Sequence, residues 1–255
     1  MDMIEVVPAS TRARGIQLMV AAAAIYLVLD FIGVHKLFTA DAEGIGALLA
    51  IIGTLYSVVY AFATYVIWGQ FAAVENEILK ESGALKDLIL FSKALKEVIR
   101  DPIVRAVRAY ARAVTESEWG ILSRGESTER TDKLFTAIIT AVIEAKPEDD
   151  SERRAHEHLL QIANQASAHR DERLALSAKR IPRTLLLFVT LTAFTILFLL
   201  VFFPFHNAVL GAVSMAIATM LLFFAHFVLT DLDNPFEGTW NVDSSAFGNL
   251  ATKFR

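Results

Sequence analysis

The sequence contains no cysteine, and this absence excludes disulfide bonds, zinc–thiolate sites, iron–sulfur clusters and a cysteine nucleophile. Glycine and proline are also scarce, with 12 and six residues in a chain of 255, so no part of the chain demands to be disordered. The net charge of −4 is too small to indicate a nucleic-acid partner. Because no pattern places a nucleophile beside a general base, we do not expect an enzyme.

Hydrophobic residues are what the chain has in excess. They make up 55% of the sequence and the mean hydropathy is +0.46, whereas soluble domains are about 45–50% apolar. The excess is concentrated in four stretches that are long enough to cross a bilayer. This excludes a purely soluble enzyme, and we predict an all-α protein that crosses the membrane at residues 16–38, 45–68, 185–205 and 208–230.

The distribution of lysine and arginine predicts the orientation in the cell (inner) membrane. The middle region holds 19 of the 24 basic residues, and Arg12 and Arg14 precede the first span. The two short outer loops carry only Lys36. Since basic residues favour the cytoplasmic side, both termini and the middle region are expected inside. The predicted parts are residues 1–68 with spans one and two, 69–184 as a helical cytosolic region, 185–230 with spans three and four, and 231–255 as a cytosolic tail.

The middle region is predicted to be helical throughout. Apolar residues recur at helical spacing over residues 74–100, and Asp101-Pro102 is typical of a helix start. Residues 151–180 read as a long charged helix. The region holds 19 acidic and 19 basic residues, and charges of both signs at helical spacing are typical of solvated faces. We expect spans two and three to continue as long helices on which the other helices of this region pack.

Two ionisable residues lie inside the predicted spans. Asp30 stands about two-thirds of the way along span one, and an acid within a span tends to face the protein interior or a water-filled cavity. The alternative is a position near the outer interface, where Asp30 pairs with Lys36 or His35. His226 in span four is a candidate pore or vestibule group, although a hydrogen-bonded packing residue is the commoner role.

Span two carries a regular stripe that is a candidate pore neck. Ile52, Tyr56 and Tyr60 are spaced by four residues and therefore lie on one slowly drifting helix face. In an oligomer around an axis they would form stacked rings, and such a constriction can gate by dewetting. By periodicity alone, an aromatic stripe in a span is more typical of a helix-packing surface.

The segment after span four contains Asn234-Pro235-Phe236-Glu237, followed by Trp240-Asn241-Val242-Asp243. This segment resembles the post-membrane segment of bestrophins. The end of span two agrees, because the stripe is followed by Trp68-Gly69-Gln70, similar to the W-N-Q-like end that follows the bestrophin neck. The middle region, notably YARAVTESEWGILSRGE, is similar to a bacterial bestrophin-like family.

The resemblance implies a homo-oligomeric channel, a pentamer, with four spans per chain and one central pore for chloride or other small anions. It also implies that Ile52, Tyr56 and Tyr60 line the neck. Bestrophin necks use phenylalanine where this chain has tyrosine, so the neck here would be more polar.

A second departure concerns the acidic run that binds calcium in animal bestrophins. Here it is reduced to Asp231, Asp233 and Glu237. Three carboxylates supply oxygen ligands for a hard cation such as calcium, although a full shell of about 6–8 ligands would need backbone oxygens and neighbours. The alternative for this segment is a helix exit and subunit contact, in which Pro235 ends the helix and Phe236 packs.

Two functions remain open at this point. The first is an ion channel that is gated at the neck. The second is a non-conducting membrane scaffold or sensor whose cytosolic helices bind a partner. The sign of a conducted ion is also open, because Asp30 and the acidic exit segment favour cations whereas the resemblance favours anions.

Overall fold

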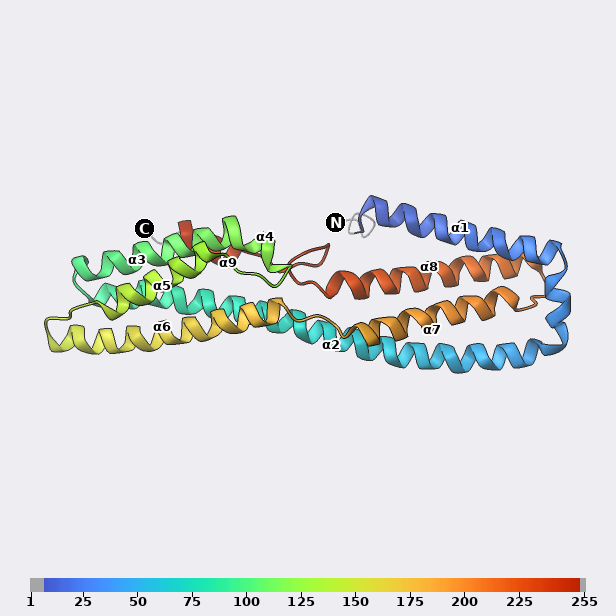
Figure 1. Ribbon diagram of the computed structural model, residues 1–255, viewed down its shortest axis with the longest axis horizontal. Helices are drawn as coiled ribbons and strands as arrows, with labels where there is room; N and C mark the ends of the chain where they lie inside the picture. Colours follow the sequence, from blue (N-terminus) through green and yellow to red (C-terminus); the bar gives the residue numbers. More distant parts are fainter. Residues whose placement is uncertain (1–6, 253–255) are drawn as a thin grey trace. The chain divides into compact units, whose positions relative to one another are not determined.

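The computed structural model describes residues 7–252, and within that range every regular element is a helix (Figure 1). The chain forms two compact units, which are described separately. The first unit comprises Met1–Trp68 and Ile181–Asp233, and the second comprises Gly69–Arg180 and Asn234–Arg255. Lys253 and Arg255, at the end of the predicted cytosolic tail, lie outside the described residues.

The first unit contains the membrane-spanning helices. Four helices in the described residues are long and apolar enough to cross a bilayer, which confirms the number of spans predicted from the sequence. Apolar side chains remain exposed along all of them, as a surface in contact with lipid requires. The elements of this unit are α1 (Ala9–Phe31), the 3-10 helix η1 (Val34–Asp41), the first part of α2 (Ala42–Phe91), α7 (Arg183–Phe202) and α8 (Ala208–Leu232).

The first span ends seven residues earlier than predicted. Gly33 adopts a φ of 83°, a left-handed conformation that favours glycine, and its N–H donates to the Asp30 carbonyl at 2.9 Å. This turn closes α1 after Phe31 and starts η1. Residues 34–38, predicted to be part of the span, therefore belong to the connection between α1 and α2.

Close packing of α1 on α8 depends on a glycine. The ring of Tyr26 lies against Gly211, where an added Cβ would overlap the Tyr26 ring. The Tyr26 hydroxyl donates to the Phe203 carbonyl at 3.0 Å, so this fully buried side chain joins α1 to the loop between α7 and α8. Small residues at such crossings allow two membrane helices to approach closely.

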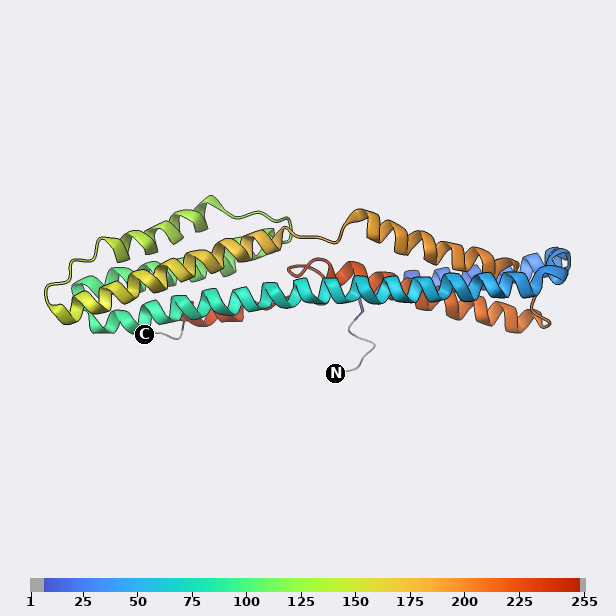
Figure 2. The same cartoon turned by 90° about the horizontal axis from the view of Figure 1, so that it is seen from below.

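Helix α2 is one uninterrupted helix of 50 residues (Figure 2). At 1.5 Å per residue it is about 75 Å long, far more than the roughly 30 Å hydrocarbon core of a bilayer. Its later part must therefore extend beyond the membrane, as expected for span two. Span three does not continue in the same way, because α6 ends at Ser177 and α7 begins at Arg183. Pro182, at the N-cap of α7, explains this break. Its ring disfavours the helical conformation for the preceding residue, Ile181.

The second unit is a helical bundle with its own hydrophobic core. The core includes Leu85, Val107 and Ile138, all fully buried. At the start of α6, Asp149 caps the helix by accepting from the N–H groups of Ser151 and Glu152, both at 2.8 Å. The elements are the later part of α2, η2 (Ser92–Ala94), α3 (Glu97–Ala113), the π-helical turn η3 (Val114–Glu118), α4 (Trp119–Leu122), α5 (Glu129–Ile143), α6 (Asp150–Ser177) and α9 (Ser245–Thr252).

The helix start predicted at Asp101-Pro102 is wrong. Helix α3 begins at Glu97, so Pro102 lies inside it. Leu95, in an extended conformation, ends the preceding 3-10 turn and separates it from α3. Pro102 costs the helix one backbone hydrogen bond, but it lies in the second turn, close to the end where unpaired N–H groups are expected.

Candidate functional site

The tyrosine stripe of α2 faces other helices of its own chain. The rings of Tyr56 and Tyr60 stack with centroids 5.7 Å apart, and the Tyr60 hydroxyl donates to the Ala225 carbonyl of α8 at 3.2 Å. Tyr56 is only 9% exposed and Ile52 is half-buried. In a single chain the stripe is thus a packing surface. Its role as a pore neck stays a prediction.

Another side of α2 is exposed and carries small side chains, whereas the side directly opposite Tyr56 carries large exposed residues, including Val58 and Tyr65. Ala50, Thr54, Ser57 and Ala61 follow one another at spacings of four, three and four residues, and none of the four is buried. The Thr54 hydroxyl donates to the Ala50 carbonyl and the Ser57 hydroxyl to the Gly53 carbonyl, both at 2.8 Å. The result is a narrow stripe of small side chains whose hydroxyl groups are satisfied by the helix itself.

The sequence offered Lys36 and His35 as partners for Asp30, and the structure pairs Asp30 with His35. Its Oδ1 lies 3.0 Å from Nδ1 of His35, and Nε2 of His35 lies 2.9 Å from the Val201 carbonyl oxygen. Tyr26 stacks on the imidazole with ring centroids 4.4 Å apart. His35 is buried, whereas the Asp30 side chain keeps 35% of its surface exposed.

This geometry dictates where protons must be. A carbonyl oxygen can only accept, so Nε2 of His35 carries a hydrogen. Nδ1 faces a carboxylate oxygen, and this contact requires a further proton on either Nδ1 or Asp30. In either arrangement the pair carries no net charge, which lowers the cost of placing Asp30 next to apolar surroundings. Asp30 was expected about two-thirds of the way along span one, but it is the last residue but one of α1, which ends at Phe31. Exposure of Asp30 to a pore or vestibule stays a prediction.

His226 lies half-buried in the later part of α8. Its backbone carbonyl accepts from the Thr230 hydroxyl at 3.0 Å. Its role as a pore or vestibule group stays a prediction.

Two acidic side chains of the exit segment accept hydrogen bonds, one from the backbone and one from a side-chain amide. In the first unit, Asp233 Oδ1 accepts from the Ile181 N–H at 2.6 Å, which joins the end of α8 to the start of the α7 segment. In the second unit, Glu237 is exposed and accepts from the Asn234 amide at 3.3 Å. Phe236 is buried against Trp119, with ring centroids 5.4 Å apart. These contacts fit the helix-exit interpretation, in which Phe236 packs.

The described residues contain no group of three or more histidine, aspartate or glutamate side chains arranged to hold a metal ion. Asp231 is half-buried, and Asp233 already accepts from a backbone N–H group. The calcium site at Asp231, Asp233 and Glu237 stays a prediction.

A buried ionic cluster in the second unit was missed by the sequence analysis. Arg173 of α6, Glu81 of α2 and Glu118 of η3 are each fully buried. Arg173 donates from Nε to Glu81 at 2.6 Å and from Nη2 to Glu118 at 2.8 Å. Tyr110 of α3 donates to Glu81 at 2.5 Å and accepts from Arg173 at 3.2 Å. Four elements are thereby joined through one guanidinium group.

Electrostatics within this cluster hold Arg173 and Tyr110 each in one protonation state. Burial alone would lower the pKa of Arg173, but the charges of Glu81 and Glu118 outweigh it and the pKa is raised. Burial and the Glu81 charge raise the pKa of Tyr110 well above its ordinary value. The phenol therefore stays protonated and the guanidinium stays charged.

The cluster continues outward along α6. Arg170 donates to Asp132 at 2.5 Å and to the Tyr110 hydroxyl at 3.1 Å. The preceding residue, His169, places Nδ1 2.8 Å from a carboxylate oxygen of Glu77 in α2. Burial raises the pKa of Glu77, but hydrogen bonds from Lys80 and His169 more than offset this and the net shift is downward.

The expectation that these charges form solvated faces is wrong for this face of α6. Its buried stripe runs through Leu159, Ile162 and Ala166 and then continues through Arg170 and Arg173 at the same spacing. This continued spacing could have indicated that Arg170 and Arg173 are buried. It was hard to recognise because exposed acidic and basic residues surround both arginines in the sequence.

The comparisons with known proteins agree with this architecture. A family model described as the bestrophin-like domain matches residues 16–247. The chain belongs to the bestrophin-like family. No curated protein matches it.

Solved structures of bestrophin homologues share the fold. A bacterial bestrophin homologue from Klebsiella pneumoniae, phased with zinc, matches with a TM-score of 0.74 and 12% identity, covering 95% of this chain and 96% of that one. A single-substitution variant of a Klebsiella pneumoniae homologue matches with a TM-score of 0.70 and 11% identity, covering 92% and 98%. At this level of identity the likeness establishes the fold. The bestrophin-like chain is thus a membrane protein with the fold of a bestrophin-type anion-channel family.

Proposed function

We propose that this bestrophin-like chain forms a homo-oligomeric channel, a pentamer, that conducts chloride or other small anions through a central pore lined by α2. Both termini and the second unit lie in the cytoplasm. Membership of the family supports this function. The structural observation that carries it is α2 itself, a 50-residue helix with one side packed on its own chain and the other side exposed.

Two faces of α2 are candidates for the neck. The predicted face carries Ile52, Tyr56 and Tyr60. The second candidate is the exposed stripe that includes Thr54 and Ser57, because a residue that lines a pore between subunits must be accessible in the isolated chain. Under this second assignment the two tyrosines support α2 from behind, through stacking and the bond from Tyr60 to α8.

The function is tested by recording currents from purified protein in a planar bilayer with a tenfold salt gradient. A reproducible current whose reversal potential has the sign for anions supports the proposal. A reversal potential with the sign for cations would overturn the anion assignment. Silence in a verified reconstitution would overturn conduction and favour a scaffold or sensor.

The neck is assigned with single-cysteine variants, because the natural chain has no cysteine that would react. Thr54→Cys and Tyr56→Cys are treated with a charged thiol reagent while current is recorded. If the exposed stripe lines the pore, the reagent blocks Thr54→Cys and leaves Tyr56→Cys unaffected. The reverse pattern supports the tyrosine neck. If neither variant is blocked although both conduct, neither of these two faces of α2 lines the conducting pathway.

A further inference from the structure

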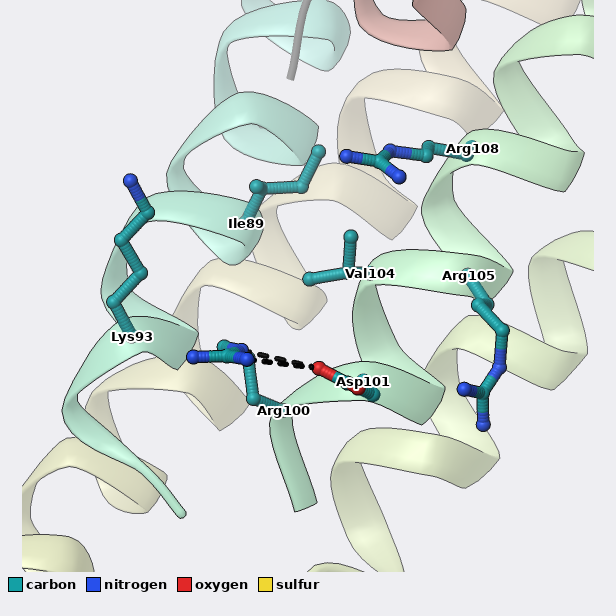
Figure 3. A pocket seen from close by; sticks show the side chains of 7 residues that line it. All are labelled: Ile89, Lys93, Arg100, Asp101, Val104, Arg105 and Arg108. Carbon is teal, nitrogen blue, oxygen red and sulfur yellow. Dashed lines mark hydrogen bonds and ion pairs between the residues drawn. The ribbon is translucent and has the colours of Figure 1, made fainter. Parts of the chain in front are cut away.

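A pocket in the second unit is lined mainly by cations. It has a volume of about 460 Å³ and lies between the end of α2 and the start of α3. That volume falls within the usual range of roughly 300–1,000 Å³ for small-molecule sites. The residues that line it are Ile89, Lys93, Arg100, Asp101, Val104, Arg105 and Arg108 (Figure 3).

The charges in this pocket are poorly compensated. Four of its side chains are basic and one, Asp101, is acidic. Arg100 pairs with Asp101 at 3.1 Å and with Glu97 at 2.9 Å. Within residues 7–252, no ion pair or hydrogen bond is formed by the side chains of Lys93, Arg105 or Arg108, in contrast to the paired arginines of the buried cluster. A net positive pocket is notable in a chain whose overall charge is −4.

The arrangement of the side chains indicates what kind of anion fits. In Figure 3, Arg108 reaches from α3 toward Ile89 of α2, Arg100 lies beyond Val104, and the Arg105 guanidinium points away from both. Positions 100 and 108 are eight residues apart, so about 12 Å of helix separates their backbones. An extended anion with several charged groups can contact cations at both of these positions.

The positive surface also continues along α3. Arg108 and Arg112 line a neighbouring hollow with Ala251 and Thr252 of α9. Like charges four residues apart on a helix repel each other. A bound polyanion would relieve this repulsion, and oxyanions of the phosphate class match guanidinium donors by forming two parallel hydrogen bonds.

We propose that the pocket between α2 and α3 binds a multiply charged phosphoanion, held mainly by Lys93, Arg100 and Arg108. The apolar floor formed by Ile89 and Val104 excludes water beneath the cations and strengthens these contacts. About 30 Å of helix separates Ile89 from Trp68, the predicted end of span two, so a headgroup of the surrounding bilayer does not reach the pocket. The phosphate groups therefore belong to a soluble oligophosphate. The site does not depend on ion conduction, since all its residues lie in the second unit.

The proposal is tested on the full chain in nanodiscs of neutral phosphatidylcholine, with tripolyphosphate binding measured by titration calorimetry at physiological salt. We expect saturable binding that weakens roughly tenfold or more for each cation removed in Lys93→Gln and Arg108→Gln. Asp101→Asn should tighten binding, because it removes the negative charge that faces the pocket. Arg154→Gln is the matched control, since Arg154 is exposed and lies outside this pocket.

A second arm uses a phosphoinositide as a control for the source of the phosphate. Thermal stability is measured in nanodiscs with and without a few per cent of this lipid, for the natural chain and for the double variant Lys93→Gln/Arg108→Gln. Because the pocket lies beyond the reach of a headgroup in the bilayer, we expect no stabilisation that depends on Lys93 and Arg108, and such a stabilisation would overturn the assignment to a soluble ligand. The proposal is also overturned if tripolyphosphate does not bind, or if the double variant binds it as well as Arg154→Gln.

Discussion

Replacement of Arg173 by methionine is the sharpest test of the buried cluster. Methionine keeps a long unbranched side chain at this fully buried position but removes the positive charge and every donor. The bonds to Glu81 at 2.6 Å, to Glu118 at 2.8 Å and to Tyr110 at 3.2 Å are lost together. Two fully buried carboxylates then remain without the cation that joins them.

The expected loss of stability comes mainly from Glu81, because Glu118 keeps Arg170 at 3.7 Å and the Thr131 hydroxyl as a donor. Breaking a buried ion pair by removing one partner costs about 3–5 kcal/mol, because the remaining charge is desolvated and uncompensated. A free energy of unfolding of roughly 5–15 kcal/mol is typical of a domain, so this loss is a large share of the total. Neutralising the carboxylates as well, in Arg173→Met/Glu81→Gln/Glu118→Gln, should recover part of it.

The assay is denaturant unfolding of the purified full chain in detergent, with hydrogen exchange of α6 as a local measure of stability. Arg154→Met is the matched control. Arg154 lies on an exposed position of the same helix, and surface substitutions usually change stability by about 0.5 kcal/mol or less. Exchange in α6 should accelerate strongly in Arg173→Met and remain unchanged in Arg154→Met.

Two results would refute this reasoning. The first is a loss below about 1 kcal/mol in Arg173→Met, which would mean that water reaches the cluster and compensates the carboxylates. The second is a triple variant less stable than Arg173→Met, because the penalty would then not come from unpaired charge.

The remaining predictions concern a helix crossing and a helix cap. Gly211→Ala should destabilise the first unit, because the new methyl group would overlap the Tyr26 ring. Gly53→Ala should be close to neutral, because no atom lies within 4 Å of the added methyl group. Thermal unfolding in detergent compares the two variants, and equal effects would contradict the proposed packing. Hydrogen bonds from the backbone N–H groups of Glu152 and Ser151 hold the pKa of Asp149 below its ordinary value. A lowered pKa in the folded state means that stability is present above the unfolded pKa and is lost as pH falls through the folded one. Asp149→Asn should therefore keep the cap and reduce the loss of α6 stability at low pH, as followed by hydrogen exchange; an undiminished acid loss in this variant would show that the cap is not its source.

The sequence alone determined the class and the membrane spans of this protein. The length of an apolar run is a local property, and lipid imposes the same requirement on every spanning helix, so residues 45–68 and 208–230 could be recognised without their neighbours. The segment from Asn234 to Asp243 likewise carried the family resemblance in its own order of residues. The end of the first span did not follow from the apolar run, since the end of α1 depends on the left-handed conformation of Gly33.

Only the tertiary structure decided which charges are buried and which side of α2 is covered. Arg173 and Arg154 lie on the same helix in similarly charged surroundings, yet one is fully buried and the other is exposed. The difference arises because α2 and η3, distant in sequence, bring Glu81 and Glu118 to Arg173. In the same way, helix periodicity put Tyr56 and Tyr60 on one face, but the contact with Ala225 of α8 decided where that face points. Whether a side chain is buried depends on the helices that pack against it, and only the fold brings those helices together.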